Sequence, residues 1–280
     1  MPNAKRARHK EARRQKIEQE RRQAKRQRLI RITAISVATA VAVIGSIWLI
    51  KINLSTPLVT TTTVATTSTS TTTPMSTTTT TLAVSQAQAD SLAASAGCPA
   101  STTTRVNNLK WSAAPAMSID TSKTYYADVI TTAGRFTIKF DAKLAPKTVN
   151  NFVFLAKNNY YHCIIFHRAI PGFMVQTGDP TGTGTGGPGY SFADELPTGA
   201  YPLYSVAMAN SGPNTNGSQF FIVTGASGQS LPDSYSYFGQ VVEGQETIVK
   251  LDGAGTPAPA TNGVPPLVTH RILSVTTYTK

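Results

Sequence analysis

The sequence has little of what metal-binding and hydrolytic proteins usually show. It holds only two cysteines in 280 residues, Cys98 and Cys163, and neither lies in a CxxC pattern, so a zinc site is not indicated. The four histidines show no metal-ligand spacing, and no serine or cysteine has an evident histidine base partner. These absences argue against a metalloenzyme and against a hydrolase that uses a nucleophile.

Net charge is nearly absent outside the N-terminus. The chain carries +12 overall, and residues 1–28 hold twelve Lys/Arg against three Glu, which leaves +9 there. Arg31 and Lys51 add +2, and from residue 52 onward twelve basic residues face eleven acidic ones, which leaves +1. A nucleic-acid-binding protein would carry its basic residues on a folded face. We therefore expect no nucleic-acid partner, and expect the arm at 1–28 to be a cytoplasmic topology signal that contacts anionic lipid.

Only one long apolar run is present. Residues 32–50 contain no charge over about 19 positions, which is enough to cross a bilayer as a helix, and the predicted span is 29–51. A cleaved signal peptide, the alternative, would have a shorter core and a small-residue cleavage site. The run ends instead in Trp48-Leu-Ile before Lys51, which favours an uncleaved anchor. The positive-inside rule then predicts a single-pass membrane protein with its N-terminus cytoplasmic and everything after Lys51 extracytoplasmic.

The rest of the chain divides by composition. Residues 52–97 are rich in threonine and serine and poor in large apolar residues, which predicts a disordered linker. Residues 98–123 form a pre-domain segment with little pattern. From 124 to 280, short β-type runs alternate with Gly- and Pro-rich turns, and helical patterns start at Pro146 and at 244. This predicts a mainly β domain, a closed antiparallel barrel.

Two blocks in this domain concentrate chemistry. The first, FHRAIPGFMVQTGD at 166–179, brings an arginine, apolar residues and a glutamine together. Strand alternation predicts that Phe173 and Val175 share one face, with Met174 and Gln176 on the other. The second, AMANSGPNTNGSQFF, is dense in Asn, Gly and Ser, which favour turns with accessible backbone groups. Together they predict a small apolar peptide-binding pocket with polar groups at its rim.

Both blocks resemble the signature segments of cyclophilins, and the likeness extends over residues 125–278. The resemblance implies an eight-stranded antiparallel barrel capped by two helices, and peptidyl-prolyl cis/trans isomerase activity without any cofactor. We expect a membrane-tethered, bacterial (actinobacterial-like) form that acts as a monomer on proline-containing secreted or envelope polypeptides. The alternative is a proline-directed peptide-binding chaperone or scaffold with little catalytic role.

Carried over to this sequence, the resemblance implies a specific site. Arg168 matches the catalytic arginine, and Gln176 matches a residue that binds the substrate backbone and positions that arginine. The residues that match the walls of the proline pocket are Phe173, Met174, Phe221 and Leu231. The residues that match the substrate groove are Ala209, Asn210 and Gln219.

Two positions depart from many eukaryotic members of the family. Ser230 stands where they have tryptophan, and Tyr235 stands where they have histidine. The tryptophan matters for cyclosporin binding in the family, so we expect weak inhibition by that drug. Finally, an extracytoplasmic domain permits a Cys98–Cys163 disulfide that would join the pre-domain segment to the barrel; two free thiols are the alternative.

Overall fold

The computed structural model describes residues 84–197, 199–258 and 261–280. Within these ranges, no helix combines the length and the apolar character that a membrane crossing requires. The predicted arm, the membrane helix at 29–51 and most of the predicted linker lie outside the described residues. They stay predictions.

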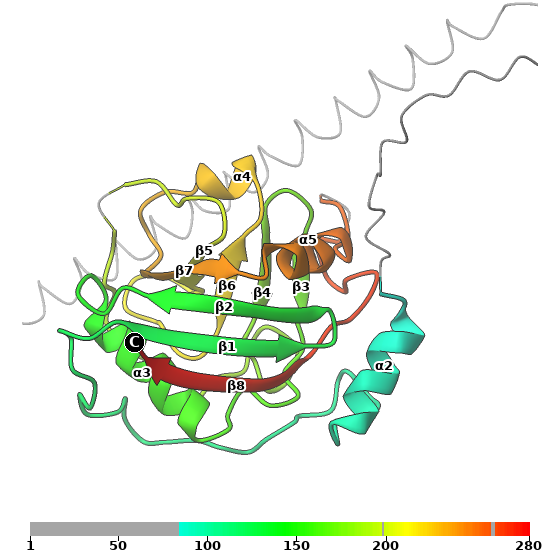
Figure 1. Cartoon of the computed structure of the whole chain (residues 1–280), viewed down its shortest axis with the longest axis horizontal. Helices are drawn as coiled ribbons and strands as arrows, with labels where there is room; N and C mark the ends of the chain where they lie inside the picture. Colours follow the sequence, from blue (N-terminus) through cyan, green and yellow to red (C-terminus); the bar gives the residue numbers. More distant parts are fainter. Residues whose placement is uncertain (1–83, 198, 259–260) are drawn as a thin grey trace, which may run out of the picture. The chain divides into compact units, whose positions relative to one another are not determined.

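Antiparallel strands form one curled sheet in the order β3-β4-β6-β5-β7-β2-β1-β8 (Figure 1). In chain order the strands are β1 (Tyr125–Thr131), β2 (Gly134–Phe140), β3 (Arg168–Ile170), β4 (Met174–Thr177), β5 (Ser205–Met208), β6 (Phe220–Val223), β7 (Tyr237–Glu243) and β8 (Ile272–Thr279). The prediction of a mainly β domain with eight antiparallel strands is confirmed.

The edge strands of this sheet, β3 and β8, meet only near their starts. Ile165, just before β3, forms an isolated antiparallel bridge with Arg271, just before β8. The Phe166 N–H donates to the His270 carbonyl at 2.9 Å beside it. Within the described ranges, β3, which is 3 residues long, and β8 share no ladder. The predicted closed barrel is thus corrected to a curled sheet whose edges are joined at one bridge.

Two helices pack on the sheet where the sequence predicts them. Helix α3, Pro146–Lys157, starts with proline in its first turn and buries an apolar face that includes Phe152. Helix α5, Gln245–Gly253, follows Gly244, which has φ +77°. A Cβ at Gly244 would lie 2.2 Å from the Arg135 carbonyl oxygen, so this entry into the helix needs glycine.

Aromatic side chains fill the interior. The Phe152 ring lies 5.0 Å from Phe140, 4.9 Å from Tyr161 and 5.5 Å from Phe220, measured between centroids. Each fully buried side chain of this size stabilises the fold by roughly 1.5–3 kcal/mol. Strand neighbours point to opposite faces, so β6 sends Phe220 into this interior and Phe221 into a second, smaller apolar cluster on the other face.

A further helix, α2 (Gln86–Ser95), precedes the pre-domain segment. Ser85 and Gln88 form a reciprocal capping box at its start, and Ala93 is buried in a cluster with Cys98. This corrects the prediction that the disordered linker continues to residue 97. The QAQADSLAAS sequence is rich in good helix formers, and the small alanine side chains allow close packing on the domain.

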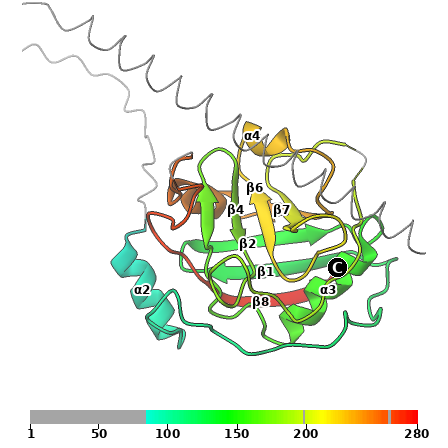
Figure 2. The same ribbon diagram turned by 180° about the vertical axis from the view of Figure 1, so that it is seen from behind.

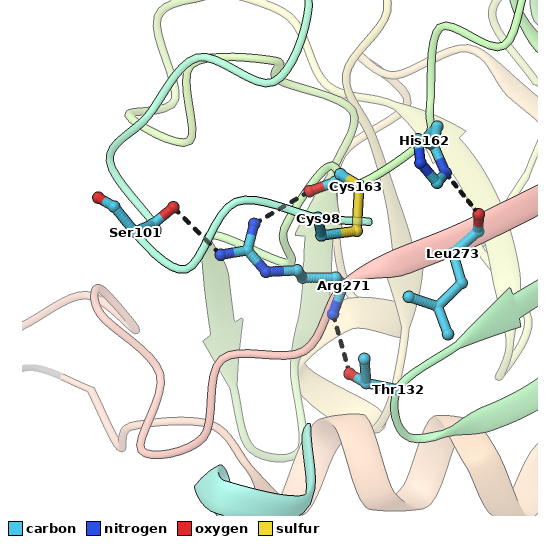
Figure 3. The surroundings of a disulfide bond; sticks show 7 residues. All are labelled: Cys98, Ser101, Thr132, His162, Cys163, Arg271 and Leu273. Carbon is cyan, nitrogen blue, oxygen red and sulfur yellow. Dashed lines mark hydrogen bonds between the residues drawn. A yellow bond between two sulfur atoms is a disulfide. The ribbon is translucent and has the colours of Figure 1, made fainter. Parts of the chain in front are cut away.

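A disulfide joins Cys98 to Cys163 across 65 positions of sequence (Figure 3). Arg271 is buried beside it, and burial lowers the pKa of its guanidinium. Its Nη1 donates to the Cys163 carbonyl at 3.2 Å and its Nη2 to the Ser101 carbonyl at 3.1 Å. Of the two alternatives that the sequence leaves open, the structure has the disulfide, and Arg271 bridges the same two segments.

The pre-domain segment, residues 98–123, lies along the outside of the domain past β8 and α3 (Figure 1, Figure 2). Its Trp111 ring packs edge-on against Phe154 of α3, with centroids 5.0 Å apart. The Asn107 Nδ2 donates to the Tyr160 carbonyl at 2.7 Å. These contacts make the segment part of the folded unit, although its sequence shows no periodicity.

Candidate functional site

A cavity of about 120 Å³ opens on the face of β4 and β6 that points away from the main interior. Its lining residues are Arg168, Phe173, Met174, Gln176, Ala209, Asn210, Phe221, Leu231 and Tyr235. Of the site residues expected from sequence, only Gln219 is outside this lining, and its Oε1 accepts from Gln176 Nε2 at 3.0 Å. The structure therefore brings every one of them together.

The floor and walls of the cavity are apolar. Met174 and Phe221 are buried, and the Tyr235 ring stands edge-on to Phe221 with centroids 5.4 Å apart. Leu231 follows the short helix α4 (Ala226–Gln229). Phe173 also belongs to this cluster, which corrects the expected pairing of Phe173 with Val175. The reason is that β4 begins at Met174, so strand alternation does not extend back to Phe173.

Arg168 forms the polar side of the cavity. It pairs with Gln176 in the β3–β4 register, and its Nη1 donates to Gln176 Oε1 at 3.4 Å. Its Cζ lies 5.9 Å from the centroid of the Phe173 ring, within range of a cation–π contact. Burial lowers the pKa of Arg168, yet an arginine in a protein keeps its proton at any working pH. A half-buried cation thus lies over an apolar pocket.

Asn262 is a site residue that the sequence reasoning missed. Arg168 Nε donates to the Asn262 carbonyl at 3.0 Å, and Arg168 Nη2 donates to Asn262 Oδ1 at 2.8 Å. These two bonds fix one edge of the guanidinium and leave Nη1 directed toward Gln176. The available signal was the Asn262-Gly263 pair, since Asn-Gly favours a turn with positive φ, and Asn262 has φ 52°.

A line of amides extends from the arginine to a glycine-rich loop at 179–189. Gln176 donates to Gln219, and Gln219 Nε2 donates in turn to the carbonyls of Gly184 and Gly186, both at 2.9 Å. The Gln176 Oε1 is consequently the atom left to accept from Arg168. The order Arg168, Gln176, Gln219 fixes which end of each side-chain amide faces the pocket.

Asp179 holds this loop in shape. Its carboxylate accepts from the backbone N–H groups of Thr181, Thr183 and Gly184 at 2.7, 3.1 and 2.6 Å. Burial by itself would raise the pKa of Asp179, but hydrogen bonds from Thr181, Gly186 and Gly184 outweigh it and keep the pKa below its ordinary value. The Asp179 carboxylate therefore stabilises the loop by accepting hydrogen bonds from its backbone.

The opposite rim is set by Asn210 and Tyr235. The Asn210 side chain donates to the Ser234 carbonyl at 2.8 Å, so its side chain is engaged with a neighbouring loop and its backbone is left for a ligand. The buried Tyr201 hydroxyl accepts from the Tyr235 N–H at 3.0 Å and donates to the Tyr235 carbonyl at 2.9 Å. Tyr201 is a second positioning residue that the sequence reasoning missed, because it contacts a segment distant in sequence.

The buried histidines are not available as acids or bases at neutral pH. Burial lowers the pKa of His167 to about 4 and that of His270 to about 4. Neither ring nitrogen of His167 has a hydrogen-bond partner among the described residues. It is a buried neutral side chain next to Arg168. The chemical groups that the site presents to a ligand are therefore the Arg168 guanidinium, side-chain amides and an apolar pocket.

One group of metal-ligating residues is present in the described part of the chain. Cys98, His162 and Cys163 place their ligand atoms within 4.8 Å of one another. Both sulfurs are already joined in the disulfide, and His162 Nδ1 is hydrogen-bonded to the Leu273 carbonyl at 2.7 Å. In this state the group offers no thiolate to a metal ion.

Comparison with known proteins places this geometry in a family. The model of the cyclophilin type peptidyl-prolyl cis-trans isomerase/CLD family matches residues 126–277. The chain is 49% identical over 126 residues to peptidyl-prolyl cis-trans isomerase-like 1 of Aspergillus fumigatus, covering 43% of this chain and 78% of the relative. It is 48% identical over 138 residues to the human isomerase-like 3, covering 47% and 81% respectively.

A solved structure of the same family also resembles this chain. A cyclophilin type peptidyl-prolyl cis-trans isomerase of Cryptosporidium parvum superposes with a TM-score of 0.51 at 33% identity, covering 56% of this chain and 99% of that chain. Another structure of that protein was obtained in the presence of the dipeptide Ala-Pro, with a TM-score of 0.50. These relatives are eukaryotic and give no support to the expected bacterial, membrane-tethered form.

Proposed function

The chain belongs to the cyclophilin-type peptidyl-prolyl cis-trans isomerase family and is an isomerase of that type, and from this premise we propose that the cavity around Arg168 is where it acts. The proline ring of an X-Pro segment enters the apolar pocket between Phe173 and Phe221. The observation that carries the proposal is the convergence of a fixed guanidinium and this apolar pocket in one cavity of about 120 Å³.

The reaction explains why this site needs a cation and no general base. Rotation about an X-Pro bond breaks no covalent bond, and its barrier of about 20 kcal/mol comes from the loss of amide resonance. As the amide twists, the prolyl nitrogen becomes pyramidal and gains a lone pair. Arg168 donates a hydrogen bond to that nitrogen and so stabilises the twisted state over the planar one.

The surrounding residues supply the positioning. Asn262 and Gln176 hold the guanidinium from two sides. The substrate backbone before the proline lies along Ala209 and Asn210, with the backbone of Asn210 free to bind it. The pocket holds the ring still while the preceding carbonyl turns.

We further propose that the clients are secreted or envelope polypeptides. The Cys98–Cys163 disulfide supports this, because disulfides persist in oxidising compartments. The predicted anchor at 29–51 agrees with it. Alkylation of thiols in intact cells, before and after lysis in the presence of reductant, tests the assignment: two free thiols in the native protein would contradict it.

The role of Arg168 is tested by Arg168→Ala in a peptide isomerisation assay on the full chain. We expect kcat/KM to fall by about 100-fold or more, as removal of a transition-state donor does. Arg135→Ala is the matched control, because Arg135 lies on β2 in an exposed ion pair with Asp128. If Arg168→Ala melts like the wild type and retains near wild-type turnover, the mechanism is wrong.

A further inference from the structure

The proline pocket continues into two larger hollows. A cavity of about 480 Å³ shares Gln176, Ala209 and Asn210 with the pocket. A third cavity, of about 540 Å³, shares Thr185 through Gly187, Tyr190 and Ser191 with the second. The three cavities thus adjoin one another through shared lining residues, and we call this row, from the proline pocket to the cavity beside the glycine-rich loop, the groove.

The far wall of the third cavity comes from the pre-domain segment. The Val106 N–H donates to the Pro180 carbonyl and the Trp111 N–H to the Pro188 carbonyl, both at 2.9 Å. At Gly189 a Cβ would lie 2.8 Å from the Trp111 carbonyl oxygen, so the close approach depends on glycine. The segment is therefore fixed against both ends of the loop. It lies before residue 126, where the family match begins.

This fixed segment places two cations on the groove. Arg105 and Lys110 line the third cavity, and its other lining residues include no Asp or Glu. In the described part of the chain neither cation has a carboxylate partner, and the buried Nη1 of Arg105 has no hydrogen-bond acceptor. Arg105 and Lys110 are therefore two cations on this cavity that no carboxylate of the described residues contacts.

The rest of the lining also suits an anion. Thr185, Ser191 and the glycine-rich loop also line the cavity, whereas the Thr181 hydroxyl already donates to Asp179 at 2.7 Å. Among the described residues Asp179 forms no ion pair with either cation, and its carboxylate accepts hydrogen bonds from backbone N–H groups of its own loop. The third cavity therefore combines positive charge with neutral donors.

We propose that the third cavity is a specificity subsite for an acidic side chain that lies on the N-terminal side of the target proline. The inference rests on the proposed function, because Ala209 and Asn210 hold the residue before the proline and the groove leads from them toward Arg105 and Lys110. The segment outside the family domain thus gives this isomerase a preference that the domain matched by the family does not carry by itself.

The test is an isomerisation assay on the full chain with a series of peptides. Each peptide carries Glu, Gln or Lys at one position upstream of the same X-Pro pair, and the position is moved step by step. We expect kcat/KM for Glu to exceed that for Gln by about 3–10-fold at the best position, as two partly exposed ion pairs allow. The preference shrinks at high salt, which screens exposed charges.

The variants Lys110→Gln and Arg105→Gln/Lys110→Gln bring the Glu-to-Gln ratio down, the double variant to about 1. Lys110 is exposed, so Lys110→Gln should leave the fold intact. This single variant therefore still tests the subsite if the double variant fails to fold because Arg105 is lost. The matched control Lys123→Gln/Lys139→Gln removes the same charge from exposed positions off the groove and keeps the wild-type ratio.

Two adverse results are distinct. A Glu-to-Gln ratio of about 1 at every position in the active wild type overturns the subsite and leaves the isomerase intact. A folded wild type that accelerates none of the peptides, the Gln series included, overturns the proposed site of action and the subsite with it.

Discussion

The Cys98–Cys163 disulfide should contribute a large share of the stability of the described domain. It closes a loop of 65 residues, for which the chain-entropy relation gives about 4 kcal/mol at 25 °C. Measured values are usually about 2–4 kcal/mol, because reduced and unfolded chains retain some structure. Reduction should therefore lower the free energy of unfolding by that amount, and shift a urea midpoint by about 1 M or more for a domain with an m-value of roughly 2 kcal/mol/M.

The assay is urea unfolding of the full chain followed by tryptophan fluorescence, with and without dithiothreitol. Trp111 reports on the pre-domain segment directly, since its ring packs on Phe154. Cys98→Ala/Cys163→Ala is the matched control, because its midpoint should equal that of the reduced wild type and should not respond to dithiothreitol. An unchanged wild-type midpoint after thiol counting has shown both cysteines reduced would refute the reasoning.

Two further predictions concern the arginine and the histidines. Asn262→Ala removes one hydrogen bond from Arg168 and loosens the other, so kcat should fall by about 10-fold with little change in KM; a KM effect alone would contradict a positioning role. For stability, an unfolded histidine binds a proton below pH 6.5, whereas folded His167 and His270 do so only near pH 4. The unfolded state thus holds more protons between those values, and unfolding free energy should fall as pH drops from about 6.5 to 4, by on the order of 2–3 kcal/mol per histidine. Denaturation midpoints across this range measure it, and His167→Phe should flatten part of the slope.

The sequence predicted the parts of the site that depend on local order. The placement of Met174 and Gln176 on one face follows from strand alternation, and the structure has both in the pocket. The alternation failed at Phe173 because the strand starts one residue later than the pattern assumes. The resemblance to cyclophilins supplied the remaining site residues. It aligns sequence positions, so it does not report which side chains contact one another.

The residues missed by sequence reasoning act across long separations. Asn262 contacts Arg168 across 94 positions, and Tyr201 contacts Tyr235 across 34. No local pattern reports such contacts. Helix α2 is a different case, since its capping box at Ser85 and Gln88 was visible in the sequence, yet the threonine-rich composition before it led the linker to be extended too far.

The pre-domain segment has a fixed position that sequence periodicity could not predict. It has neither strand nor helix, and its position comes from the disulfide, Arg271 and backbone bonds to the 179–189 loop. The proline pocket is lined entirely by residues that follow Ile165, so the pre-domain segment contributes no side chain to it. Arg105 lies between the Cys98 anchor and the Val106 contact with Pro180, so its place on the groove does need it. In the functions proposed above, selectivity for acidic substrates and resistance to unfolding therefore depend on the same disulfide-linked segment, while the rotation of the X-Pro bond depends on Arg168 and its pocket.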